Sequence, residues 1–352
     1  MKLTFSYIWL FCIAMVALTL FTACDHKELC ELHDHIDYSR VRIDVDWTDF
    51  LSKETPTGMT VTMYPADKQR LPVSVLTNNI DYAIVNLPAG SYNMLVFNQS
   101  PSEFGSLSFE GMDDFSTSRI AGKQITSRWY QSRDYDEIVI TEPEWVGMEA
   151  QRSILVTKAM VEKTNTILAT SRGSRAEGDV LLTTAYPKNI ISTLTVIVHI
   201  KGIYNLRSAR AAINGMAAGY LLGENRPTAS RATQLLEKWT ITTDAEAPTQ
   251  GVIKGKIATF GLPFGHQELP DENRLNLSLL LVDGTTIKDY SFAIGDKFEY
   301  KIDAEANVEL SLLLEIYIDE SLPDVEPSGG SSSGFDATVD DWGDEEQVDI
   351  GM

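Results

Sequence analysis

Residues 308–318 read VELSLLLEIYI, and this stretch decides how the chain folds. Every second residue from Val308 to Ile318 is apolar. Side chains two positions apart lie on the same face of a β-strand, so this period predicts a strand with one buried and one wetter face. It is the clearest strand in the chain. We expect Leu312 and Leu314 to face the core, and we expect Glu309 and Ser311 to tolerate substitution.

The same alternation marks other strands of a C-terminal β-sandwich, which we place at residues 180–320. It occurs in Leu194–Lys201, where His199 falls on the face opposite the main apolar stripe, and in Leu275–Leu281. Asp283-Gly284 then predicts a tight hairpin that returns through Thr285–Phe292, because both residues tolerate the left-handed backbone of such turns.

Three further stretches complete the expected C-terminal sandwich. Trp239–Thr243 and Lys254–Phe260 are predicted strands. Ser208–Tyr220 is small and apolar and contains Gly215 and Gly219. A glycine inside a strand often marks a bulge, so a bulged strand is favoured over a short helix.

The N-terminal half predicts a second β-sandwich over residues 40–150. Short alternating or apolar runs are separated by Pro- and Gly-containing turns, as sandwiches require. Asn98–Arg133 is expected to hold long loops and one or two edge strands, and residues 151–179 are taken as the junction. The expected strands lie in Arg40–Trp47, Met59–Met63, Tyr82–Asn86, Tyr92–Phe97 and Ile138–Ile140.

The first 23 residues are typical of a secretory signal peptide. Phe5–Leu20 is almost entirely apolar, and small residues lead into Ala23-Cys24. A cysteine directly after the cleavage position resembles a bacterial lipobox, which predicts that Cys24 carries lipid such as palmitate. The alternative is a transmembrane anchor, since the run is near the lower limit of about 17 residues for a span. Residues 24–39 then form a lipid-proximal tether, which predicts a lipid-anchored, surface-exposed protein.

Composition narrows the classes of partner. Removing residues 1–23 takes away Lys2 and lowers the net charge from −21 to −22. Such acidity argues against nucleic acid as a partner. The length suits two domains of ordinary size. Only Cys30 would remain unmodified among the three cysteines, so no internal disulfide is expected.

Candidate catalytic and metal-binding residues are sparse. Only His199 and His266 lie in the expected folded part, and neither accompanies a nucleophile motif. The spacing of Cys30, His33 and His35 suits a soft metal, but a structural zinc site needs four ligands, so a solvated tether is favoured. Two carboxylates can meet in any fold, which leaves a glycosidase as the catalytic alternative. We predict a non-enzyme without cofactor or metal.

Several of these stretches resemble one known family. Leu87–Asn98, with its Leu-Pro-Ala-Gly-Ser-Tyr turn, Leu194–Gly219 and Val339–Trp342 are similar to the fimbrillin-like lipoproteins of Bacteroidales, of the fimbrium anchor or minor subunit type. The Cys24–His35 segment resembles an uncharacterised branch of them. The resemblance implies transthyretin-like or immunoglobulin-like sandwiches, outer-membrane attachment, other fimbrillin-like subunits as partners, and strand exchange between subunits.

The acidic tail, residues 321–352, is the candidate strand-exchange segment. The linker Ser328–Gly334 is rich in Ser and Gly and gives it reach. Apolar side chains follow at Val339, Trp342, Val348 and Ile350, and they would be costly to leave in water. The alternative is a disordered acidic tail.

We therefore predict a structural or anchoring subunit that pairs strands with its partners. The alternative function is a lipid-tethered binding module for glycan or protein. It needs an exposed aromatic platform, for which Trp129, Tyr130 and Tyr135 are the candidates. Packing in a core or at an edge would explain these residues equally well.

Overall fold

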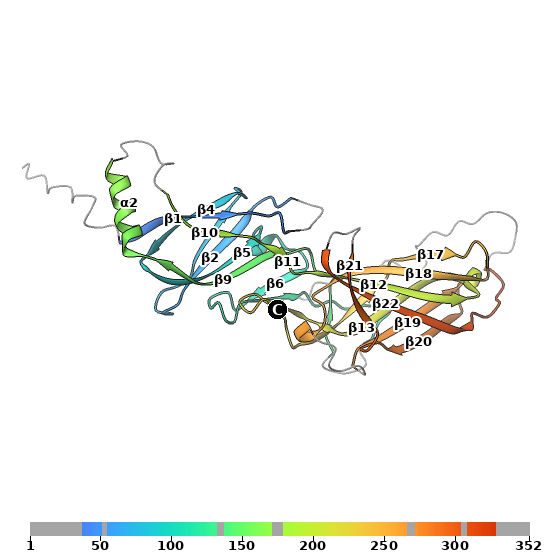
Figure 1. Ribbon diagram of the computed structural model, residues 1–352. Helices are drawn as coiled ribbons and strands as arrows, with labels where there is room; N and C mark the ends of the chain where they lie inside the picture. The colour runs from blue at the N-terminus through green and yellow to red at the C-terminus, as the bar shows by residue number, and fades with distance from the viewer. Residues whose placement is uncertain are drawn as a thin grey trace, which may run out of the picture. The chain divides into compact units, whose positions relative to one another are not determined.

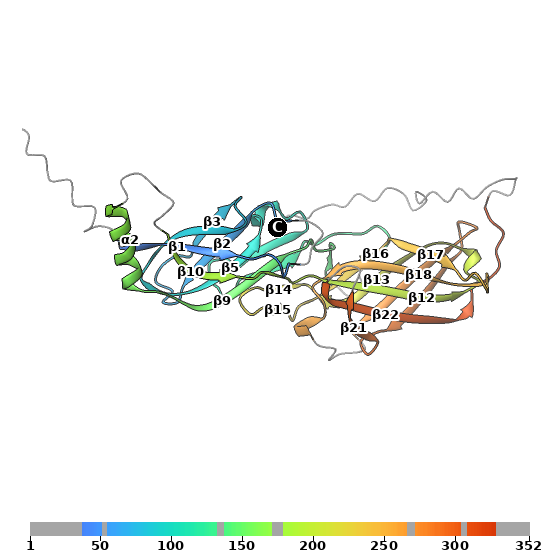
Figure 2. The same ribbon diagram turned by 45° about the horizontal axis from the view of Figure 1, so that its top comes forward.

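A computed structural model describes residues 37–50, 55–131, 137–170, 179–265, 272–303 and 308–328 (Figures 1 and 2). The expected all-β class is confirmed, since 22 strands in five sheets account for most of these residues. The expected domain boundaries stay a prediction.

Two five-stranded sheets form the C-terminal sandwich. The first has the order β17 (Trp239–Thr243), β18 (Gln250–Thr259), β12 (Ser192–Lys201), β22 (Val308–Ser321) and β21 (Phe298–Asp303). The second has the order β20 (Ile287–Ala293), β19 (Arg274–Leu281), β13 (Leu206–Ala217), β16 (Arg231–Leu236) and β8 (Val139–Ile140). All the strands expected in this half are therefore present.

The core between these sheets collects the alternating apolar residues. Val196 of β12, Leu314 of β22 and Leu279 of β19 are fully buried in one cluster. β22 runs parallel to β12 and antiparallel to β21, so it is an inner strand of its sheet. The buried positions of Leu312 and Leu314 confirm the predicted inward face.

One expectation about β22 was wrong. Ser311 is only 5% exposed, although its alternation with leucine predicted a wet position. Its neighbours on β12, Thr193 and Thr195, are also buried. The outer face of the sheet is therefore covered at this end, which a pattern within one strand does not reveal.

The predicted turn and bulge are both confirmed. β19 and β20 pair from Arg274↔Ala293 to Leu280↔Ile287, and the turn contains Gly284 at φ +69°. In β13 the pairing with β16 shifts between Ile213 and Met216, and Gly215 lies there at φ +78°. Both glycines adopt the left-handed conformation that other residues enter at a cost.

Three further sheets combine strands of the N-terminal half with short strands from residues 180–189 and 219–227. Their orders are β11 (Lys188–Asn189), β9 (Gly147–Val156), β5 (Gly90–Asn98), β2 (Met59–Pro65), β3 (Val73–Thr77); β10 (Val180–Ala185), β1 (Tyr38–Val45), β4 (Tyr82–Pro88); and β15 (Arg226–Pro227), β14 (Gly219–Leu221), β7 (Arg119–Gly122), β6 (Leu107–Glu110). Short 3-10 turns lie at Pro101–Glu103, Ile203–Asn205 and Pro263–Gly265. A second core cluster includes Phe97 and Phe115 together with Tyr220 and Phe260.

The helix α2 (Lys158–Thr170) lies inside the predicted junction, where no helix was expected. Met160, Thr164 and Ile167 recur at helical spacing, and Thr157 caps the first turn by accepting from the Met160 N–H at 3.3 Å. Ser39 of β1 donates to the Met160 carbonyl at 3.2 Å and lies 3.1 Å from the Thr164 hydroxyl. These contacts fix the helix against the start of β1.

The described chain divides into two compact units. One comprises the described residues of 37–42, 84–90 and 155–182, and the other comprises those of 43–83, 91–154 and 183–328. The surfaces discussed below belong to the second unit.

Candidate interaction surface

The predicted modification and strand-exchange residues lie outside the described part of the chain. These are Cys24, and Val339, Trp342, Val348 and Ile350. Tyr135, His266, Cys30, His33 and His35 lie outside it as well. The structure therefore bears on the surfaces that could receive such a segment, and on Trp129 and Tyr130.

The edges of the sheets are the first such surface. β17 and β21 bound one C-terminal sheet, and β20 is an outer strand of the other. Among the described residues, no strand pairs with the outer side of β17. A row of peptide N–H and C=O groups at an edge is a template for a further strand.

The edge strands differ in how they are protected. β20 carries Lys288 and Asp289, and charged side chains of this kind discourage pairing with other chains. β17, with the sequence WTITT, has no charged residue and no proline, and Ile241 is 39% exposed. β3, with the sequence VSVLT, is a similar edge with Leu76 at 59% exposure. β17 and β3 are therefore the two uncharged edges best suited to accept a strand.

β17 is held firmly in its sheet. Its residues pair with β18 from Trp239↔Gly255 to Thr243↔Gly251. The Trp239 indole N–H donates to the Leu236 carbonyl at 3.1 Å, and its ring packs against the sandwich core. An incoming strand would thus meet an ordered edge.

The chain beyond β22 stays attached up to the last described residues. Leu322 is buried, and its N–H donates to the Lys201 carbonyl at 2.9 Å. The Ser328 N–H donates to the Val282 carbonyl at 3.2 Å. The candidate strand-exchange segment therefore follows a fixed point beside the β19–β20 turn.

Trp129 is fixed on the sandwich rather than projecting as a mobile ring. Its indole N–H donates to the Glu237 carboxylate at 2.6 Å. The guanidinium of the buried Arg210 lies 5.4 Å from the ring centre, and Tyr130 makes an edge contact at 5.8 Å. The ring is half-buried, so this candidate platform is partly a packing element.

Tyr130 belongs to a polar network. Its hydroxyl donates to the Glu137 carboxylate at 2.6 Å and accepts from the Asn214 amide at 2.8 Å. Burial, followed by the hydrogen bond to Glu137, raises the pKa of Tyr130 to about 12. The phenol therefore stays neutral at physiological pH and acts as a positioning group.

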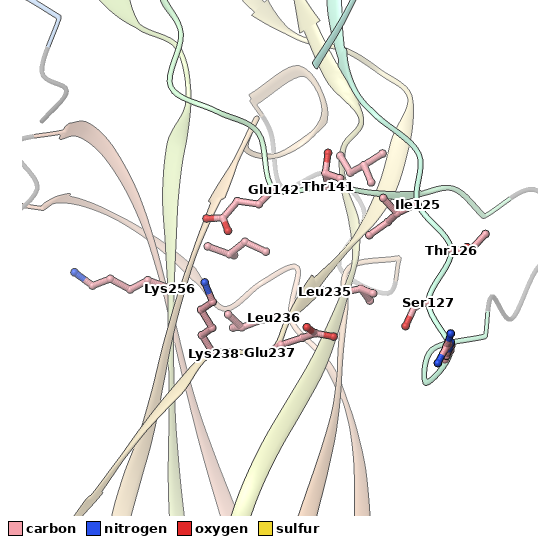
Figure 3. A pocket seen from close by; sticks show the side chains of 13 residues that line it. Ile125, Thr126, Ser127, Thr141, Glu142, Leu235, Leu236, Glu237, Lys238 and Lys256 are labelled. Carbon is pink, nitrogen blue, oxygen red and sulfur yellow. The ribbon is translucent and has the colours of Figure 1, made fainter. Parts of the chain in front are cut away.

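A cavity of about 200 Å³ lies beside the segment that leads to Trp129 (Figure 3). Figure 3 shows Ile125, Thr126 and Ser127 on one side, with Glu142, Lys238 and Lys256 on the other. Glu142 accepts the backbone N–H of Ala258 at 2.7 Å, so its carboxylate fastens a strand. Glu142 therefore has a structural role, because its carboxylate already has a hydrogen-bond partner in the fold.

Sequence reasoning missed an aromatic pair on the outer face of the other sheet. His199 of β12 and Tyr317 of β22 stack with ring centres 4.2 Å apart. Glu315 lies 2.7 Å from His199 Nε2 and accepts from the Tyr317 hydroxyl at 3.1 Å. The alternating patterns place His199 and Tyr317 on the outward faces of their strands. Their contact with each other depends on the parallel register of β12 and β22. His199 is half-exposed, as predicted.

Within the described ranges, no group of three or more His, Cys, Asp or Glu side chains is arranged to hold a metal ion. No helix of the described chain has the length and apolar character that crossing a membrane requires.

Comparisons with known proteins agree with this architecture. A family profile described as "Domain of unknown function (DUF5119)" matches residues 23–237. No protein with a curated description matches the sequence. The solved structure of a candidate adhesin from Bacteroides ovatus is similar with a TM-score of 0.55 and 13% identity, over 86% of this chain and 98% of that one. This likeness shows a shared fold.

More distant structures match as well. They include a candidate polysaccharide-binding protein from Bacteroides thetaiotaomicron, with a TM-score of 0.46 and 9% identity over 80% of this chain and 92% of that one. The fimbrial anchor protein Mfa2 from Porphyromonas gingivalis matches with a TM-score of 0.43 and 9% identity, over 80% of this chain and 90% of that one. Fimbrial and adhesin proteins are thus among the matches, as the sequence resemblance implied.

Proposed function

We propose that this chain, which belongs to the DUF5119 domain family, is a structural or anchoring subunit of a fimbrium-like assembly at the cell surface. A lipid on Cys24 would tether it to the outer membrane, and strand pairing would join it to neighbouring subunits. The fold shared with a candidate adhesin supports a surface role. The observation that carries strand pairing is the uncharged, ordered edge β17.

Strand pairing would proceed by β-augmentation. An extended segment of a partner lies along β17 and forms main-chain hydrogen bonds with its outer side, while its side chains give specificity. The donor would be a segment with alternating apolar residues behind a flexible linker. In this chain the candidate donor is the segment that contains Val339, Trp342, Val348 and Ile350.

The edge is tested by adding a charge to it. Ile241→Lys places a cation on β17, and a lysine on an edge strand disfavours pairing. We expect this variant to recover much less of the partner subunits when it is co-purified from the surface fraction. Ile287→Lys is the matched control, because Ile287 is 49% exposed on β20, an edge that already carries charge.

Both variants should unfold at the same temperature as the unmodified protein, because neither side chain is buried. Equal recovery of partners with Ile241→Lys and with Ile287→Lys would contradict pairing at β17.

The tether is tested separately with Cys24→Ala. A single acyl chain gives only marginal membrane binding, so stable anchoring takes more than one lipid signal. We expect the variant to lose incorporation of a labelled fatty acid and to leave the membrane fraction. A variant that still labels and sediments with membranes would show that Cys24 is not the anchor.

A further inference from the structure

A second cavity, of about 320 Å³, lies between the segment Trp129–Gln131 and the strands β19 and β20. We call it the Trp129 groove. Its floor is the outer face of the sheet, whose inner face carries the buried Leu275, Leu277 and Leu279. The cavity volume is near the lower end of the range of about 300–1,000 Å³ that is typical of small-ligand sites.

The floor consists of two polar cross-strand pairs. Asn276 faces Ser291, and Ser278 faces Asp289. Their side chains are joined, since Ser291 donates to the Asn276 amide oxygen at 2.7 Å and Ser278 donates to the Asp289 carboxylate at 2.5 Å. Polar groups are therefore already oriented before any ligand arrives.

The neighbouring residues hold these groups in place. Arg274 donates to the Ser291 hydroxyl at 2.9 Å from Nη2. Asn276 donates to the Asn214 amide oxygen at 2.5 Å, and Asn214 belongs to the network of Tyr130. Such support keeps a binding site close to its working geometry and reduces the entropy lost on binding.

The floor of the groove offers mainly hydrogen-bond acceptors to a ligand. Ser278 has given its proton to Asp289, which leaves the lone pairs of its oxygen available to a ligand. Ser291 instead helps to hold the floor, because its hydroxyl donates to Asn276 and accepts from Nε and Nη2 of Arg274. An ionised carboxylate accepts about four hydrogen bonds, and Ser278 supplies one of those to Asp289. Asp289 is the only charged residue among the described residues that line the groove. The groove therefore disfavours anions and favours ligands rich in hydroxyl donors.

The wall of the groove is aromatic. Trp129 is fixed by Glu237 and Arg210, as described above. A rigid indole offers a large apolar contact surface with little loss of rotamer freedom. One ligand class combines an apolar ring face with a rim of hydroxyl donors, namely a neutral saccharide.

We propose that the Trp129 groove binds a neutral saccharide, with a sugar ring packed against Trp129 and its hydroxyl groups donating to Asp289 and Ser278. The cavity holds one or two sugar rings. This activity is independent of strand pairing at β17, and it would let a surface subunit recognise glycan directly.

Binding is tested on the mature chain without its lipid-bearing Cys24, residues 25–352. The probes are neutral di- and trisaccharides of glucose, galactose, mannose and N-acetylglucosamine, with a sialylated trisaccharide as the anionic comparison and a lysine-rich peptide as the cationic one. Calorimetry and tryptophan fluorescence report binding. We expect at least one neutral probe to bind and the sialylated probe to bind at least tenfold more weakly.

Three variants locate the site. Trp129→Ala should weaken binding of the neutral probe at least tenfold. Asp289→Asn, which can still accept from Ser278, should weaken it several-fold without changing the unfolding temperature. Tyr317→Ala is the matched control, because that aromatic residue is 62% exposed on the other sheet.

The proposal is overturned if no neutral probe binds. It is overturned equally if Trp129→Ala and Asp289→Asn bind as the unmodified protein does, if Tyr317→Ala loses binding to the same degree, or if only the lysine-rich peptide binds. Should Trp129→Ala fail to fold, Asp289→Asn decides the question.

Discussion

Asp283 shows how one side chain closes a turn. Its carboxylate accepts from the Thr286 hydroxyl at 2.6 Å and from the N–H groups of Thr286 and Thr285 at 2.9 and 3.1 Å. These bonds, with that from the Thr286 hydroxyl the largest contribution, lower the pKa of Asp283 from 3.8 to about 2. The charged form is therefore favoured by folding.

The lowered pKa predicts a pH dependence of stability. The contribution of Asp283 is fully present above its unfolded pKa, near pH 4, and is lost as the pH falls through its folded pKa, near pH 2. Asp283→Asn should unfold at a lower temperature than the unmodified protein above pH 4, and the two should converge toward pH 2. Thermal unfolding between pH 2 and 6 measures this difference.

Thr286→Val is the control for the Asp283 prediction. It removes the hydroxyl that lowers the pKa most, so the stability contributed by Asp283 should be smaller and should be lost over a narrower pH range. A difference between Asp283→Asn and the unmodified protein that does not change with pH would contradict the argument.

At the scale of the element, β22 should be sensitive to substitution, because it is an inner strand that pairs on both sides. Leu312→Ala or Leu314→Ala should lower the free energy of unfolding by about 2–5 kcal/mol, the cost of emptying a packed leucine site. Glu320→Ala, at an exposed position of the same strand, should change it by less than about 0.5 kcal/mol. Denaturant unfolding compares the three variants.

Ser311 is the position in β22 where the structure and the sequence pattern predict different effects of substitution. Its 5% exposure predicts a larger loss on substitution with a bulky residue such as phenylalanine than the same change would cause at Glu320. Equal and small effects at Leu314, Ser311 and Glu320 would show that β22 is not packed as the structure has it.

The elements differ in how far sequence could predict them. β22 and the β19–β20 hairpin were predictable, because period-two patterns and an Asp-Gly turn act locally. α2 was missed, although Met160, Thr164 and Ile167 have helical spacing, because the fully buried position of this face is the polar Thr164 and not an apolar residue. The parallel pairing of β22 with β12 was not predictable, since register between distant strands is set by tertiary packing.

At the scale of the whole molecule, the candidate surfaces depend on topology more than on motifs. Trp129 could be named from sequence as an aromatic candidate. Its position over Ser278 and Asp289 could not, because these residues lie far away along the chain and meet only when β19 and β20 are placed. β17 was predicted as a strand, but its role as an edge follows from the sheet order alone.

The acidic tail gives the last prediction. Every described contact of the chain end is made by Ser328 or by residues before it, so deleting residues 335–352 removes no described packing. The truncated protein should therefore unfold at the same temperature as the full chain. Co-purification of partner subunits should fall, because the candidate donor segment is gone.

A second tail variant separates its apolar side chains from its charge. Replacing Val339, Trp342, Val348 and Ile350 by serine keeps every acidic residue, and it should weaken co-purification as much as the deletion does if these side chains fill pockets on a partner. Unchanged co-purification in both variants would remove the donor-strand proposal. A large fall in unfolding temperature on deletion would mean that the segment completes a sheet of its own chain, most simply at the uncharged edge of β17, and Ile241→Lys should then lower the unfolding temperature too.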